Sequence, residues 1–164
     1  RLIVPADMGL SRLHRLLQSV FRWQDYHLHD FTVGDQNGQR VIRFVPYEGD
    51  LEFDRDAVLI GRHTLADIFP KHRDLLYTYD MGDNWRHAIK LVRVIEDYDR
   101  ESPYLLEASG QAPPEDVGGV GGFIFFRRIM LDPKHEEHAE MKAWAGYWTP
   151  ELSEYMSQPR VIRV

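Results

Sequence analysis

The stretch Leu75–Val94 reads LLYTYDMGDNWRHAIKLVRV, and it carries the strongest indication of the fold of this chain. Aromatic and branched side chains recur at every second position on both sides of its central turn, which is typical of two half-buried strands. We predict a hairpin in which Tyr79 pairs with Trp85. That register also places Tyr77 opposite His87. Cross-strand aromatic pairs contribute roughly 0.2–1 kcal/mol each, so this register is favoured over a slip by one residue.

The turn of this hairpin, residues 80–84, carries two carboxylates, an amide and a glycine. In a structural interpretation, Asp80 and Asp83 accept backbone N–H bonds within the turn. In a functional interpretation, the same side chains form the rim of a site. Both interpretations stay open at the level of the sequence.

The composition restricts the classes of function. At 164 residues the chain is long enough for one domain, which we place over residues 1–164. No apolar run approaches the roughly 18 residues that cross a bilayer. The chain contains no cysteine, which excludes disulfides and thiolate metal sites and fits a cytoplasmic protein. A formal net charge of −6 argues against a general nucleic-acid binder, which needs clustered lysine and arginine.

Turn residues and apolar spacing divide the rest of the chain into strands and helices. We predict strands at residues 1–4, 27–33 and 40–45, and we extend the second strand of the central hairpin to residue 96. We predict helices at residues 9–22, 65–69, 123–131 and 134–145, with a last short helix from residue 149. Asn37-Gly38 is a hairpin-turn signal, and residues 97–109 form a connection.

Histidines occur on two of these elements. The first helix places His14 beside its apolar stripe and directs Arg12 and Gln18 towards water, so we interpret His14 as a packing residue. On the following strand, period two puts His27 and His29 on one face, where they either bind a metal together or only pack or pair with a carboxylate. The second arrangement is the more frequent one. We therefore expect no tightly bound metal and no cofactor.

Two other stretches have some features of ion-binding loops. Residues 47–56 are acidic but lack the terminal glutamate of an EF-hand, so we predict a solvated loop or an edge strand. The glycine-rich stretch 110–122 precedes a helix, as a phosphate-binding loop does. It lacks the following Gly-Lys-Ser/Thr, and Glu115 and Asp116 repel an anion, so we expect no phosphate there.

Three motifs occur in a fixed order: HLHDF at residues 27–31, YTYDMGDNWRH at residues 77–87 and APPEDVGG at residues 112–119. Together with VPA at residues 4–6 and Leu13-His14, they resemble the plasmid pRiA4b Orf-three-like family. Some of its members are labelled TnpR-like passengers of insertion elements. The resemblance extends to about Trp148. It implies an α+β fold, with a mixed or mainly antiparallel sheet and helices packed on it.

The chain departs from the pattern of this family in two places. Members usually carry another strand before a Trp-Arg-Arg stretch, and because this sequence opens at Arg1, we expect that strand to be missing. Members also often have cysteines around the Pro-Pro-Glu-Asp loop, where this chain has Leu106, Ala112 and Val117. The label of some members suggests a resolvase, but none of the serines lies in the arginine cluster that a serine recombinase needs. We therefore exclude that chemistry.

Three functional hypotheses follow. The first is a non-catalytic binding or accessory module associated with plasmid or mobile-element DNA, because no catalytic motif is assembled. The second is a metal-dependent hydrolase, whose ligands come from histidines and carboxylates. The histidines are His27, His29 and His87, and the carboxylates are Asp80, Asp83, Glu115 and Asp116. The third is a DNA-binding partner of a transposition complex, which the acidic net charge disfavours.

We predict a binding cleft at one end of the sheet, where the glycine- and proline-rich segment folds back on the hairpin tip. Its lining residues are His27, His29, Asp80, Asp83, Trp85, His87, Glu115 and Asp116. As a structural alternative, Glu115 caps the next helix or pairs with Arg86 or His87. The charge balance favours a protein or small-molecule partner over nucleic acid, and we expect no membrane contact.

Overall fold

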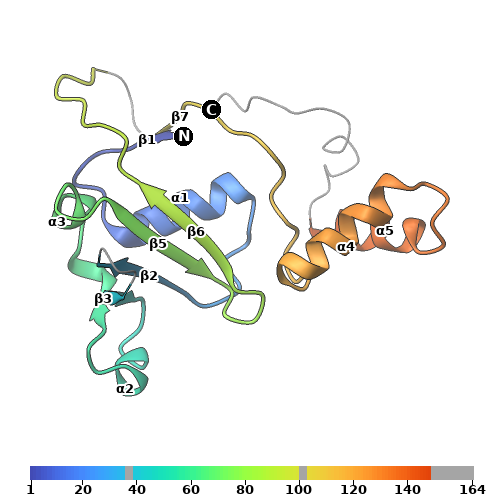
Figure 1. Cartoon of the computed structure of the whole chain (residues 1–164), viewed down its shortest axis with the longest axis horizontal. Coiled ribbons are helices and arrows are strands. Elements are labelled where there is room, and N and C mark those ends of the chain that lie inside the picture. Colours follow the sequence, from blue (N-terminus) through green and yellow to red (C-terminus); the bar gives the residue numbers. More distant parts are fainter. Residues whose placement is uncertain (36–38, 100–102, 149–164) are drawn as a thin grey trace.

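A computed structural model describes residues 1–35, 39–99 and 103–148 of the chain, and its central feature is the predicted hairpin (Figure 1). Strands β5 (Asp74–Tyr79) and β6 (Trp85–Lys90) pair antiparallel. Tyr79 lies opposite Trp85 and Tyr77 opposite His87, so the predicted register is confirmed. A slip by one residue would turn the fully buried Tyr77 and Tyr79 out of the core, which is why this register holds.

Five strands form one mixed sheet in the order β4-β3-β2-β5-β6. Strand β2 (His29–Gly34) pairs antiparallel with both β3 (Arg40–Val45) and β5. The short β4 (Val58–Leu59) runs parallel to β3. A separate pair joins β1 (Leu2–Ile3) to β7 (Tyr104–Leu105). The fold is therefore α+β with a mixed, mainly antiparallel sheet, as the resemblance implied.

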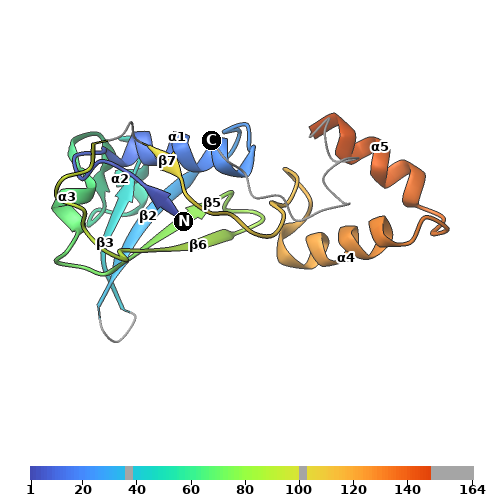
Figure 2. The same ribbon diagram turned by 90° about the horizontal axis from the view of Figure 1, so that it is seen from above.

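The helix α1 (Leu10–Phe21) lies across one face of the sheet, as Figure 2 shows from above. Its apolar stripe meets the inward side chains of β2 and β5, and the core lies between these two layers. The largest fully buried side chains include Met8, Leu10, Phe31, Tyr77 and Tyr79. The loop that follows α1 begins close to the hairpin tip, where Trp23 stacks on Tyr79 with ring centroids 4.7 Å apart.

Two further helices project away from this core, on the right of Figure 1. They are α4 (Gly119–Leu131) and α5 (His138–Trp148), and with their connection we call them the helical arm. Phe126 of α4 meets Trp144 of α5 with ring centroids 6.1 Å apart. The short helices α2 (Asp50–Phe53) and α3 (Leu65–Ile68) and the 3-10 turn η1 (Ile60–Arg62) complete the fold. None of the described helices has the length and apolar character of a membrane span.

Several boundaries differ from the sequence-based expectations. Strand β6 ends at Lys90 instead of residue 96, because its partner β5 starts opposite at Asp74. Beyond that point the chain leaves the sheet, and Val92 and Val94 are exposed. The expected connection at residues 97–109 contains β7, which completes the pair with β1.

The helical predictions also need correction. Residues 50–53 form α2 where we expected a solvated loop or an edge strand. Acidic side chains in the first turn of α2 stabilise it, because they interact favourably with the helix dipole. Helix α4 begins at Gly119, before the expected start, while α5 begins only at His138. The intervening residues first form tighter turns, such as the bond from His135 N–H to the carbonyl of Asp132. The Asn37-Gly38 turn and the helix from residue 149 lie outside the described residues, and the single domain over residues 1–164 stays a prediction.

The segment at residues 113–119 folds back onto the hairpin tip. Gly118 donates its N–H to Asp83 Oδ2 at 3.0 Å, and Trp23 Nε1 donates to the carbonyl of Pro113 at 2.9 Å. Gly119 has a φ of 66°, a backbone conformation that residues with a side chain rarely adopt. A Cβ at this position would lie 2.8 Å from the carbonyl oxygen of Asp83. The close approach of the two segments therefore requires glycine at residue 119.

The variant Gly119→Ala tests this contact. We expect it to lower the free energy of unfolding by on the order of 2 kcal/mol, because the new Cβ combines a left-handed backbone with an overlap against Asp83. The control is Gly121→Ala in α4, where a Cβ meets open space. It should stabilise the protein by about 0.5–1 kcal/mol. Urea unfolding measures both values, and a Gly119→Ala protein as stable as wild type would contradict the contact.

Candidate functional site

Polar side chains gather in two groups near the hairpin tip. The first group contains His27, Asp80, Glu115 and Asp116, and we call it the tip cluster. The second contains the stacked rings of His14 and His29, which we call the histidine pair, with Asp25 beside them. Among the described residues, each group includes three side chains whose donor atoms all lie within 4.8 Å of one another. In the tip cluster these three are His27, Asp80 and Asp116.

His27 stands at the centre of the tip cluster. Its Nε2 lies 3.1 Å from Asp116 Oδ1, 3.7 Å from Asp80 Oδ2 and 3.8 Å from Glu115 Oε2. This nitrogen is shielded from solvent and has no hydrogen-bond partner among the described residues, because the contacts to Asp80 and Glu115 are too long and the one to Asp116 is not aligned for a hydrogen bond. The loop before β2, the hairpin turn and the loop before α4 each contribute to the group. The cluster therefore depends on the tertiary fold.

The turn itself orients Asp80. Its Oδ1 accepts the N–H groups of Gly82 and Asp83 at 2.9 and 3.2 Å, and its backbone has a φ of 55°. These bonds are the structural role that the sequence suggested for Asp80. The other oxygen, Oδ2, faces His27. The turn thus uses one half of the carboxylate and leaves the other half directed at the cluster.

The two carboxylate oxygens of Glu115 also have different partners. This side chain is 3% exposed, and its Oε1 accepts the N–H of Gln24 at 2.7 Å and the hydroxyl of Tyr79 at 3.0 Å. Its Oε2 faces His27. Burial raises the pKa of the Glu115 carboxyl, while the bonds from Gln24 and Tyr79 and the neighbouring His27 oppose that rise. The Tyr79 pKa is also raised, first by burial and then by the charge of Glu115.

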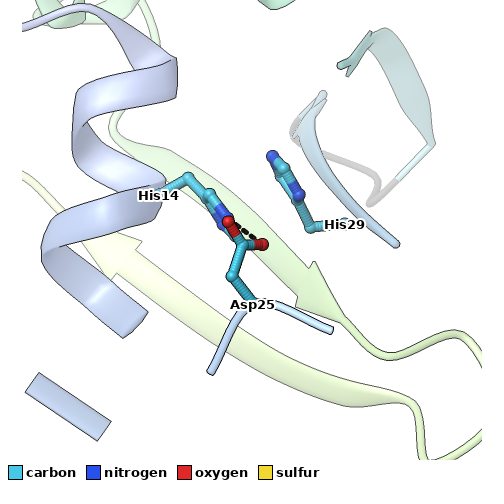
Figure 3. A group of neighbouring side chains, drawn as sticks. All are labelled: His14, Asp25 and His29. Atoms are coloured by element: carbon cyan, nitrogen blue, oxygen red, sulfur yellow. Dashed lines mark hydrogen bonds and ion pairs between the residues drawn. The ribbon is translucent and has the colours of Figure 1, made fainter. Parts of the chain in front are cut away.

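The histidine pair is buried and uncharged at neutral pH. His14 and His29 are 4% and 6% exposed, and their rings stack in parallel with centroids 3.5 Å apart (Figure 3). His14 Nδ1 lies 2.8 Å from the Tyr77 hydroxyl, and its Nε2 lies 2.7 Å from Asp25 Oδ1. Burial is the main cause that lowers the pKa of both rings. For His29, burial and the neighbouring His14 together lower the pKa to about 4.

The hydrogen-bond network behind this pair differs from our predictions. We predicted His14 as a packing residue and Gln18 as a side chain directed towards water, and the prediction for Gln18 is wrong. Gln18 is 5% exposed, because its amide donates to the Tyr77 hydroxyl at 3.0 Å and its carbonyl accepts the N–H of Asp25 at 2.9 Å. Gln18 follows His14 by about one helical turn, so the two share a helix face. That spacing was the available signal.

The remaining predicted site residues have other partners. Asp83 Oδ2 accepts the N–H of Gly118 instead of facing His27. Trp85 and His87 pack around Trp23, with ring centroids 6.3 and 5.4 Å from its ring. These side chains hold the hairpin, the loop after α1 and the glycine-rich segment together.

The structure therefore divides the predicted set into parts. The tip cluster takes His27, Asp80, Glu115 and Asp116, while His29 stacks on His14. The centre with three histidine ligands does not form, because β2 begins at His29 and His27 lies in the loop before it. Glu115 neither caps α4 nor pairs with Arg86 or His87, because Gln24 and Tyr79 hold it.

Comparison with known proteins adds the family. The family model described as plasmid pRiA4b ORF-3-like protein matches residues 1–156. The chain belongs to this family. A relative from Sinorhizobium fredii, named uncharacterized protein y4hQ, is 40% identical over 148 residues, which make up 89% of this chain and 72% of the relative. The match confirms the resemblance that the three sequence motifs carried.

A crystal structure also resembles this member of the pRiA4b ORF-3-like family. It is that of a protein of unknown function, MM3350 from Methanosarcina mazei Go1, with a TM-score of 0.75 and 33% identity. The likeness covers 88% of this chain and 79% of that one. These relatives are proteins of unknown function, so the chemistry has to be argued from the residues.

The histidine pair makes stability depend on pH. Because the pKa of His29 falls from 6.5 when unfolded to about 4 when folded, the unfolded chain binds more protons between these values. The part of the free energy of unfolding that depends on His29 is therefore fully present above pH 6.5 and is lost as the pH falls towards 4. From pH 7.5 to pH 5 we expect His29 to account for a loss of about 2 kcal/mol.

Urea unfolding at pH 7.5 and pH 5 measures this loss. His29→Gln should reduce the difference between the two values by about that amount, whereas His72→Gln, in the loop before β5, should keep the wild-type difference. An unchanged difference in His29→Gln would show that His29 is not buried in the neutral form.

Proposed function

We propose that this protein is a non-catalytic binding module that holds a divalent cation in the tip cluster. The observation that supports the proposal is that the two oxygens of each of two carboxylates have different partners. Asp80 and Glu115 each use one oxygen for hydrogen bonds and direct the other at His27 Nε2. Ligand carboxylates at metal sites are commonly oriented in this way by partners of their second oxygen.

The charges of the tip cluster favour the same ligand. Three carboxylates surround one imidazole, so the group carries excess negative charge even when His27 is protonated. Asp80 and Glu115 are 7% and 3% exposed, which limits the compensation that water supplies. A divalent cation at this position balances the charge. This proposal departs from our sequence-based expectation of no tightly bound metal.

The donor set points to a class of ion. The distances of 3.1 to 3.8 Å from His27 Nε2 to the carboxylate oxygens suit atoms arranged around an ion roughly 2.0–2.2 Å from each. One imidazole nitrogen with carboxylate oxygens suits Mn²⁺ or Zn²⁺, whereas Mg²⁺ and Ca²⁺ prefer oxygen alone. His27, Asp80 and Asp116 supply the three ligands, and Glu115 lies against His27 as a fourth group.

Hydrolysis is the second candidate function. Its support is the Asp116 side chain, which is 48% exposed and leaves one side of the cluster open to water. A metal with three protein ligands and one water lowers the pKa of that water. We place cation binding before hydrolysis, because the described contacts of the tip cluster suit the binding of an ion and none of them positions a substrate.

The family provides the setting for this proposal. Its description refers to a plasmid, which fits an accessory role for plasmid or mobile-element DNA in the cytoplasm. The net charge of −6 favours a protein or small-molecule partner over direct nucleic-acid binding.

Metal titration of the purified chain tests the proposal. We expect Mn²⁺ or Zn²⁺ to bind with one ion per chain, measured by calorimetry and by elemental analysis after dialysis. Asp116→Asn should weaken binding by at least about tenfold, because it removes one charged ligand. The control is Asp74→Asn, an exposed carboxylate that faces Lys90 at the other end of β5 and should bind like wild type. No bound ion at millimolar metal, or equal binding by Asp116→Asn, contradicts the proposal.

A further inference from the structure

A second set of metal-binding side chains lies at the histidine pair, apart from the tip cluster. His14, Asp25 and His29 each offer one donor atom, and these three atoms lie within 4.8 Å of one another (Figure 3). His14 comes from α1, Asp25 from the loop after it and His29 from the start of β2. The group therefore forms only when helix, loop and sheet come together in the fold.

The His29 ring has a buried nitrogen without a partner. Its Nε2 is shielded from solvent and makes no hydrogen bond within the part of the chain that the structure describes. Native proteins rarely leave a buried polar atom in this state, because the loss of its bonds to water costs free energy. The stack on His14 does not supply the missing bond, since it brings the faces of the two rings together. An ion held by the three side chains would give the His29 ring a partner.

His14 is already oriented as a metal ligand is. Its Nδ1 lies 2.8 Å from the Tyr77 hydroxyl, and its Nε2 lies 2.7 Å from Asp25 Oδ1. Gln18 donates to the same hydroxyl and accepts the N–H of Asp25, so it holds the neighbours of His14 on both sides. Ligand histidines at metal sites commonly have their second ring nitrogen held by such a partner.

Coordination of one ion requires small movements of the other two side chains. The rings of His14 and His29 are parallel within 3°, so the lone pairs of their nitrogens do not converge. His29 therefore has to turn about its Cβ–Cγ bond, and its Nε2 makes no hydrogen bond that resists the turn. The Asp25 side chain is 52% exposed, which allows it to open its contact with His14 for an ion.

We propose that His14, Asp25 and His29 bind a second divalent metal ion, Zn²⁺ or Fe²⁺, between α1 and the sheet. Two imidazoles and one carboxylate are a frequent donor set for these ions. The burial that lowers the pKa of both rings also keeps them unprotonated at neutral pH, as a nitrogen ligand must be. The pH dependence expected for His29 refers to the metal-free chain.

This site is independent of the tip cluster. Both of its nitrogen ligands are buried, so the ion enters most readily while the chain folds. The single ion expected from titration of the folded chain therefore belongs to the tip cluster, and the second site has to be loaded during refolding.

Refolding of the Asp116→Asn chain, which lacks one ligand of the tip cluster, tests the second site. The chain is unfolded in urea with EDTA, freed of EDTA, refolded with Zn²⁺ and dialysed. By elemental analysis we expect it to retain one Zn²⁺ per chain more than the same chain with Asp25→Asn added. Asparagine suits residue 25, because it tolerates the local φ of 58° and the side chain is half exposed.

The matched control adds Asp74→Asn instead, an exposed carboxylate on β5 that should leave the zinc content unchanged. Equal zinc in the Asp116→Asn chain with and without Asp25→Asn overturns the proposal. The comparison is made within the Asp116→Asn chain, so it stands whether or not the tip cluster of wild type binds a cation.

The ¹⁵N NMR signals of the histidine rings provide a site-specific measurement. In the refolded Asp116→Asn chain, we expect Zn²⁺ to shift the ring-nitrogen signals of both His14 and His29, because a coordinated nitrogen shares its lone pair with the metal. The signals of His72, in the loop before β5, should stay in place. A purely structural histidine pair would show no shift, and unmoved signals of His14 and His29 overturn the proposal.

Discussion

The hydrogen bond from the Tyr79 hydroxyl to Glu115 joins the parts of this molecule. Tyr79 belongs to the buried strand β5, and Glu115 belongs to the segment that leads into the helical arm. The backbone N–H of Gln24, from the loop after α1, donates to the same oxygen. A buried carboxylate is costly unless fixed donors meet it, so the two bonds leave Glu115 one favourable position. Sheet, loop and arm are connected at this one oxygen.

This connection concentrates negative charge at the hairpin tip. Once Glu115 is held, its second oxygen must face His27, where Asp80 and Asp116 already stand. An arrangement chosen for stability alone would avoid three carboxylates around one imidazole, because their mutual repulsion opposes folding. Local conflict of this kind is commonly found at functional sites, where the fold tolerates it for the sake of a ligand.

Histidines close in the sequence have opposite electrostatic environments. The rings of His14 and His29 are stacked and buried, and desolvation outweighs the neighbouring Asp25, so both remain neutral. His27, two residues before His29, faces carboxylates instead. The difference arises where the chain enters β2: from His29 onward the pleat determines side-chain direction, whereas His27 precedes the strand.

The hairpin register could be predicted from the residues of β5 and β6, because burial on one face of β5 allows a single alternation for Tyr77 and Tyr79. The sequence also predicted α1 and the return of the glycine-rich segment to the tip. The pairing of each histidine with a carboxylate, in contrast, depends on the folded arrangement. Local periodicity placed His27 with His29, but the partners of His27 come from segments distant in the sequence, whose approach depends on the packed core. The periodicity of side chains predicts which residues share one face of a strand or helix. Contacts between residues of different elements depend on how those elements pack in the fold.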